Sequence, residues 1–151
     1  MKILKKYNQL TETRNLFKKK GLSFAYSNNI SYLIRRLKLP IMQIGDFNKS
    51  WDIYNSFNFI DKNLTDNGKI LDVGCYGSEI LLSLYKGGFK NIHGIDTNPK
   101  IKKMPFSNKI NYHVGNFFEN KFESASFDCI TSISVIEHGY DEKKFFSEFS
   151  R

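Results

Sequence analysis

Cysteine and proline are scarce in this 151-residue chain, which contains two and three of them respectively. Cys75 and Cys129 form neither a metal-spaced cluster nor a small disulfide framework, so we expect two reduced, buried thiols and no metal site. No apolar run reaches the roughly 18 residues that a membrane-spanning helix needs. Lysine and polar residues interrupt the N-terminus where a signal peptide has its apolar core. These absences favour a cytoplasmic protein without a membrane span.

Acidic residues are almost missing from the first 40 positions. Residues 1–40 contain ten Lys or Arg and one acid, Glu12, whereas residues 41–151 contain thirteen Lys or Arg and fourteen acids. The net charge of +8 therefore comes entirely from the N-terminal segment. Such an arm can attract nucleic acid, anionic lipid or an acidic substrate, although a solvated helical face is the simpler interpretation.

Three helices are predicted in the first 65 residues, at about 1–20, 30–38 and 49–63. The middle helix rests on an apolar stripe with i, i+3, i+4, i+7 spacing, formed by Ile30, Leu33, Ile34 and Leu37. The third helix should bury Ile53, Phe57 and Ile60 and begin at a cap from Asn48 or Ser50. We therefore expect residues 1–65 to form a basic helical extension or cap.

Short apolar segments alternate with helices from residue 66 onwards. We predict strands at 69–74, 91–96, 110–114 and 127–135, and helices at 79–86 and 141–149. The fourth strand is the most apolar, and His93 and His113 are expected to pack within their strands. Strands that alternate with helices predict an α/β fold with a parallel sheet and right-handed crossovers. Residues 66–151 should therefore form one α/β domain.

Parallel α/β sheets bind ligands beyond the C-terminal ends of their strands. Glycines follow the first predicted strand in Asp72-Val73-Gly74-Cys75-Tyr76-Gly77-Ser78, where they permit a tight turn and a close ligand approach. Asp96 ends the second strand, 22 residues after Gly74, a separation at which an acid can accept hydrogen bonds from ribose hydroxyls. The third and fourth strands are followed by Gly115-Asn116-Phe117 and Ser134-Val135-Ile136-Glu137-His138.

Three of these segments resemble motifs of the class I S-adenosylmethionine-dependent methyltransferases, in the order and at the spacing of that family. They are Ile70-Leu71-Asp72-Val73-Gly74-Cys75, then Gly94-Ile95-Asp96, then Phe127-Asp128-Cys129-Ile130 with Ser134-Val135-Ile136-Glu137-His138. The resemblance covers residues 69–151 and is greatest to the small-molecule domains of types 11 and 12. It implies a Rossmann-like parallel sheet and S-adenosyl-L-methionine as the cofactor.

The resemblance also implies roles for individual residues. Cofactor contacts would come from Asp72, Gly74, Cys75, Gly77, Asp96, Asn116, Phe117, Ser134 and Val135. Asp72 would orient the ammonium end of the methionine, Asp96 would bind the ribose diol, and Asn116 would accept a hydrogen bond from the adenine. For Cys75, simple packing is the more economical interpretation. Tyr76 and Ser78 stand where the family has glycines, and Asn116 stands where it has an acid.

Glu137 and His138 are the candidate catalytic residues, because a hydroxyl or amine acceptor must lose a proton and His138 has a reference pKa near neutrality. The alternative is that the Glu-His pair is a structural feature at a helix start. The acceptor should be a small molecule or a sugar- or lipid-linked compound. Two other functions stay open: a cofactor-binding module without catalysis, and an RNA methyltransferase that uses the basic arm.

The family's sheet has seven strands, and the sequence predicts four. We therefore expect a domain truncated at its C-terminus, lacking the part that normally carries substrate-binding residues. The fourth strand would then present an unprotected edge, which invites self-association.

Overall fold

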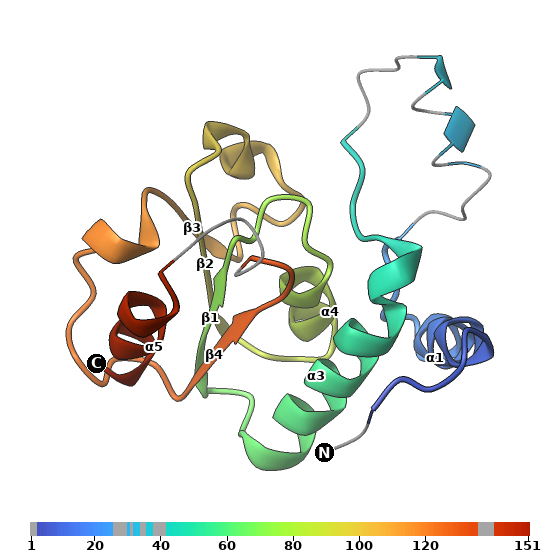
Figure 1. Cartoon of the computed structure of the whole chain (residues 1–151), viewed down its shortest axis with the longest axis horizontal. Helices are drawn as coiled ribbons and strands as arrows, with labels where there is room; N and C mark the ends of the chain where they lie inside the picture. Colours follow the sequence, from blue (N-terminus) through green and yellow to red (C-terminus); the bar gives the residue numbers. More distant parts are fainter. Residues whose placement is uncertain (1–2, 26–29, 31, 34–35, 38–41, 136–140) are drawn as a thin grey trace.

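The protein is an α/β structure built on a four-stranded parallel sheet (Figure 1). The computed structural model describes residues 3–25, 30, 32–33, 36–37, 42–135 and 141–151. The strands are β1 (Lys69–Val73), β2 (Asn91–Asp96), β3 (Asn111–Val114) and β4 (Cys129–Ser132), in the spatial order β3-β2-β1-β4. All three neighbouring pairs are parallel. The Rossmann-like fold expected from the sequence is therefore confirmed.

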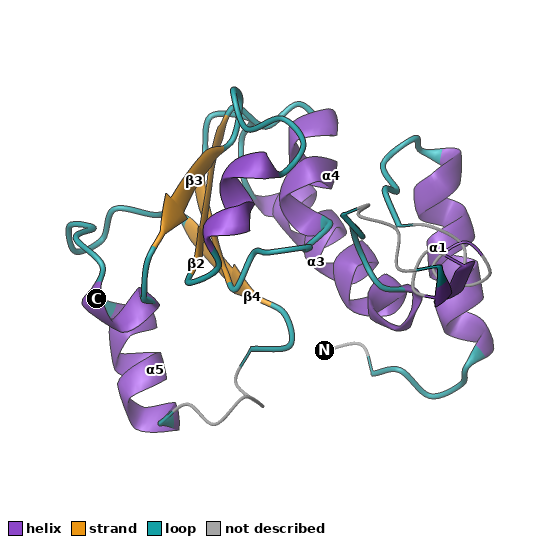
Figure 2. Cartoon of the chain, turned by 90° about the horizontal axis from the view of Figure 1, so that it is seen from above, coloured by secondary structure: helices purple, strands orange, loops and turns teal. Residues whose placement is uncertain are grey.

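Helices cover both faces of the sheet (Figure 2). They are α1 (Asn8–Lys19), α3 (Ser50–Asn63), α4 (Ile80–Lys86) and α5 (Glu142–Ser150), with short 3-10 turns η1 (Phe47–Lys49), η2 (Pro99–Lys103) and η3 (Phe117–Glu119). α3 and α4 lie on one face, α1 packs on the far side of α3, and α5 lies on the opposite face. None of the helices in the described ranges is long and apolar enough to cross a bilayer.

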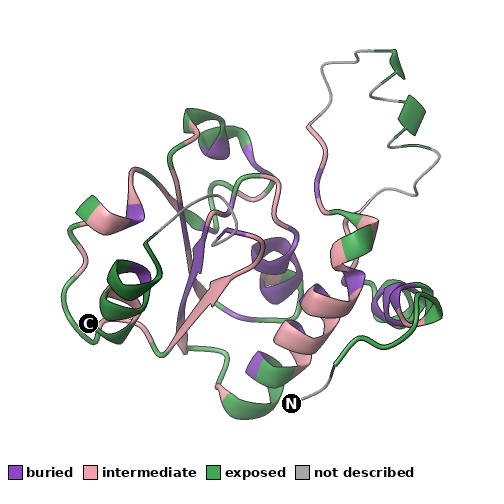
Figure 3. Cartoon of the chain, viewed as in Figure 1, coloured by how far each residue is buried: buried purple, intermediate pink, exposed green. Residues whose placement is uncertain are grey.

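Two apolar cores lie on the two faces of the sheet, as the alternation along β1 requires (Figure 3). Ile70 points into the larger core, whereas Leu71 and Val73 point into the smaller core beside α5. The larger core also holds residues from α1, α3 and the segments between them, namely Phe17, Leu22, Ile44, Ile53, Phe57 and Ile60. The N-terminal segment thus shares a core with the sheet, while its description as a separate extension or cap stays a prediction.

The predicted fourth strand is too long. β4 covers only Cys129–Ser132, and all four of its residues are half-buried. Two residues after the strand ends, Ser134 takes a left-handed conformation with a φ of 62°, which an extended strand to residue 135 could not contain. Cys129 is half-buried with its strand, so the expectation of a buried thiol is wrong at this position. β4 nevertheless lies at an edge of the described sheet, as expected.

The predicted cap of the third N-terminal helix is also wrong. Lys49, not Asn48 or Ser50, is the N-cap of α3, and it makes no side-chain cap bond. The Ser50 hydroxyl instead donates to the carbonyl of Phe47, because η1 precedes the helix and places that oxygen within its reach.

The apolar stripe predicted at 30–38 does not face the core. Ile30, Leu33 and Leu37 are about half exposed. Ile34 lies outside the described residues.

Candidate cofactor site

A cavity of about 610 Å³ opens at the C-terminal ends of β1, β2 and β4. This volume lies within the range typical of small-molecule and cofactor sites. The lining includes five of the residues predicted from the sequence to contact a cofactor: Gly74, Gly77, Asp96, Ser134 and Val135. These residues come from three separate segments of the chain, and the parallel sheet brings them together.

The turn after β1 requires glycine at two positions. Gly74 and Gly77 have φ angles of 75° and 72°, where side chains with a Cβ are strained. A Cβ at Gly74 would lie 2.4 Å from Cγ2 of Val135, and one at Gly77 would lie 3.3 Å from the carbonyl oxygen of Gln43. Packing against Val135 therefore excludes a side chain at Gly74, whether or not a ligand is bound.

The Asp96 carboxylate is fixed at the cavity by two backbone groups. Its Oδ2 accepts from the N–H of Tyr76 at 2.9 Å, and its Oδ1 accepts from the N–H of Asn98 at 2.8 Å. Each carboxylate oxygen can accept a further hydrogen bond. A held carboxylate beside a glycine turn fits the ribose diol of S-adenosylmethionine, and Tyr76, although bulky, is 37% exposed at the rim.

Asp72 lies behind the glycine turn and is only 1% exposed. Burial raises the pKa of this carboxyl to about 7. Hydrogen bonds from Thr131, whose hydroxyl lies 2.7 Å from Oδ1, and from Ser78 act in the opposite direction, and the charge of Asp96 adds to the increase in pKa. Near neutral pH a nearby cation would therefore shift Asp72 towards its ionised form.

Three other predicted contacts lie away from the cavity lining. Cys75 is fully buried, and burial raises the pKa of its thiol, so it is a neutral packing group under Gly94. Oδ1 of Asn116 accepts from the N–H of Phe118 at 3.1 Å and caps η3. The Phe117 ring is buried in the smaller core. Their roles toward a cofactor stay predictions.

The candidate catalytic residues Glu137 and His138 lie outside the described residues.

One wall of the cavity comes from the N-terminal segment, which the sequence did not predict. Gln43, Gly45, Asp46 and Lys49 line this side. The N–H of Gly45 donates to the carbonyl of Gly77 at 2.8 Å, which ties the wall to the glycine turn. The sequence predicted only a loop that ends near Gly45, and nothing in that loop indicated a role in ligand binding.

A second hollow of about 420 Å³ adjoins the cavity. The two share Lys49, Ile133 and Ser134 as lining residues. The rest of the second hollow is formed mainly by α3, through Trp51, Asp52, Asn55 and Ser56. Ser134, with its left-handed backbone, therefore lies at the junction of the two.

Comparison with known proteins agrees with this geometry. A family model described as a methyltransferase domain matches residues 71–151, which is more than half of the chain. The match includes the last three residues of β1, all of β2, β3, β4, α4 and α5, and every residue predicted to contact a cofactor. No curated protein matches the chain.

Proposed function

The chain belongs to the methyltransferase-domain family and is a class I S-adenosylmethionine-dependent methyltransferase, and from this premise we propose how it binds its cofactor and what it methylates. S-adenosyl-L-methionine binds in the cavity at Gly74, Gly77 and Asp96. The methyl group goes to a small molecule or a sugar- or lipid-linked acceptor. The observation that carries the proposal is the Asp96 carboxylate, held by two backbone N–H groups at the rim of the glycine turn.

Each cavity residue has a defined task in this proposal. Asp96 accepts hydrogen bonds from the ribose hydroxyls with the free acceptor capacity of its two oxygens. Asp72 supplies negative charge behind the turn when a cationic ammonium group binds. The cofactor, when bound, supplies a methyl group on a sulfonium that is already activated. The protein then mainly aligns the acceptor, and effective molarity accounts for much of the rate.

The second hollow supports a small acceptor. Its volume of about 420 Å³ is within the range of small-molecule sites, and it shares Ser134 with the cofactor cavity. Trp51 offers an apolar ring, while Asp52 and Asn55 offer hydrogen-bond acceptors for hydroxyl or amine groups. Glu137 and His138 complete the proposal as proton acceptors for the reacting atom.

Isothermal titration with S-adenosylhomocysteine tests the cofactor site. We expect one site, and an affinity at least tenfold lower in Asp96→Ala, because loss of the two ribose hydrogen bonds costs on the order of 1–3 kcal/mol. Asp61→Ala is the matched control, since Asp61 is an exposed acid on α3 and does not line the cavity. Equal affinities in the wild type and Asp96→Ala would refute the assignment.

A second assay separates the enzyme from a binding module. Transfer of a radiolabelled methyl group to a pool of small hydroxyl and amine acceptors is expected from the wild type, and at subsaturating cofactor it should be slower in Asp96→Ala, which binds the cofactor more weakly. Binding of S-adenosylhomocysteine without transfer to any acceptor would favour the module without catalysis.

A further inference from the structure

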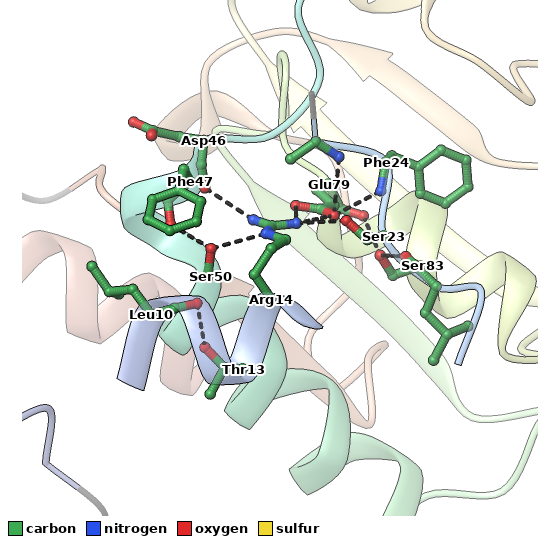
Figure 4. Close-up of polar contacts among 12 residues, drawn as sticks. Leu10, Thr13, Arg14, Ser23, Phe24, Asp46, Phe47, Ser50, Glu79 and Ser83 are labelled. Carbon is green, nitrogen blue, oxygen red and sulfur yellow. Dashed lines mark hydrogen bonds and ion pairs between the residues drawn. The ribbon is translucent and has the colours of Figure 1, made fainter. Parts of the chain in front are cut away.

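A buried ion pair joins α1 to the start of α4 (Figure 4). Nη1 of Arg14 lies 2.6 Å from Oε1 and 2.7 Å from Oε2 of Glu79. The two side chains are only 3% and 0% exposed, although the residues are 65 positions apart in the sequence. Charges buried this deeply are tolerated only where their hydrogen-bonding capacity is satisfied.

The remaining hydrogen bonds of the pair go to other segments of the N-terminal region. Arg14 donates from Nε to the Ser50 hydroxyl at 2.9 Å, from Nη1 to the Ser23 hydroxyl at 2.8 Å, and from Nη2 to the Asp46 carbonyl at 3.1 Å. Glu79 Oε1 also accepts from the backbone N–H groups of Phe24 and Ala25, at 2.8 and 3.2 Å. Two side chains thus connect α1, the segment after it, the loop before η1, α3 and α4.

This cluster lies directly behind the cavity wall. Glu79 follows Ser78 of the glycine turn and itself lines the cavity. Asp46, whose carbonyl accepts a hydrogen bond from Arg14, also lines the cavity, and the N–H of its neighbour Gly45 donates to the carbonyl of Gly77. The fit around Gly45 is close, because a Cβ there would lie 2.6 Å from Oε2 of Glu79.

We infer that Arg14 and Glu79 are positioning residues for the cofactor site, which hold residues 43–46 as one wall of the cavity. The inference rests on the proposed function. A buried ion pair is weak evidence for a role in stability, since well-packed apolar side chains often replace such pairs without loss. What an apolar pair cannot supply is the hydrogen bond to the Asp46 carbonyl and those from Phe24 and Ala25.

The test separates positioning from stability. In the double variant Arg14→Met/Glu79→Met, apolar side chains of similar length fill the same space. We expect it to remain folded in the absence of urea, with a lower urea midpoint because the N–H groups of Phe24 and Ala25 lose their acceptor, and to bind S-adenosylhomocysteine at least fivefold more weakly. In turnover assays the KM for the cofactor should rise more than kcat falls. Glu148→Gln, which breaks the more exposed Arg151–Glu148 pair, is the control and should bind as the wild type does.

If the double variant does not fold, Arg14→Lys still tests the inference. Lysine retains the charge facing Glu79 but lacks the planar fork that reaches Ser50 and Asp46 together. Its affinity for S-adenosylhomocysteine should fall at least threefold. Wild-type affinity in either folded variant overturns the inference. Absence of binding in the wild type would instead overturn the proposed function.

Discussion

Replacement of Asp72 by asparagine should change how the stability of the protein depends on pH. Asp72 is 1% exposed, and burial raises its pKa from 3.8 to about 7. Asparagine has nearly the same shape, and its carbonyl oxygen can accept the 2.7 Å hydrogen bond from Thr131. The variant therefore removes the titrating carboxyl at position 72 and keeps the packing around it.

The sign follows from proton binding in the two states. Between about pH 4 and pH 7 the carboxyl is protonated in the folded protein and ionised in the unfolded chain. Folding then takes up a proton, so the free energy of unfolding decreases as pH rises through this window. For a pKa raised to about 7, the wild type should lose about 2–3 kcal/mol relative to Asp72→Asn between pH 5 and pH 8.

Urea denaturation of both proteins at pH 5, 6, 7 and 8, followed by circular dichroism, measures this difference. Other titrating groups are common to both proteins and cancel in the comparison. Parallel stability profiles would refute the reasoning, because they would mean that the buried carboxyl has an ordinary pKa. Saturating S-adenosylhomocysteine should also reduce the pH dependence of the wild type, since its ammonium group favours the ionised carboxylate.

Two further predictions concern the histidine pair and the basic arm. His93 and His113 stack with a 3.1 Å contact between ring nitrogens, and burial, His113 and Lys69 lower the pKa of His93 to about 4. The free energy of unfolding should fall by about 1–2 kcal/mol, after allowance for partial exposure, as pH drops from about 6.5 towards 4. In His93→Gln, urea denaturation should show a smaller pH dependence over this range. RNA binding by the arm should be weak, and Lys18, Lys19 and Lys20→Gln should reduce the salt slope in fluorescence anisotropy by about two. A tight, sequence-selective complex at physiological salt would contradict a small acceptor.

The strands could be predicted because their signals are local. β2 spans Asn91–Asp96 as expected, and the glycine turn follows β1 as expected. The chain path after β4 could not be predicted, because nothing in the apolar run indicates that the serine at position 134 takes a left-handed conformation. Periodicity identifies segments that can be buried, and says less about where the chain must turn.

The N-terminal wall could not be predicted for a different reason. Its position depends on Arg14 and Glu79, which are 65 residues apart and belong to helices that look independent in the sequence. A weak signal existed: Arg14 shares a helix face with the buried residues Leu10 and Phe17, four and three positions away. A cation on an apolar stripe indicates a buried acid elsewhere, and composition alone cannot identify that acid.

The hydrogen bonds at Ala25 and Gly45 have a consequence for protein engineering. Ala25 donates to Glu79, and Gly45 donates to Gly77 two residues earlier, so residues 25 and 45 lie close together. The entropy of closing a loop between fixed ends grows slowly, by about 0.6 kcal/mol for each doubling of length. Because Ala25 and Gly45 are fixed close together, a connection of another length between them would cost the fold little closure entropy.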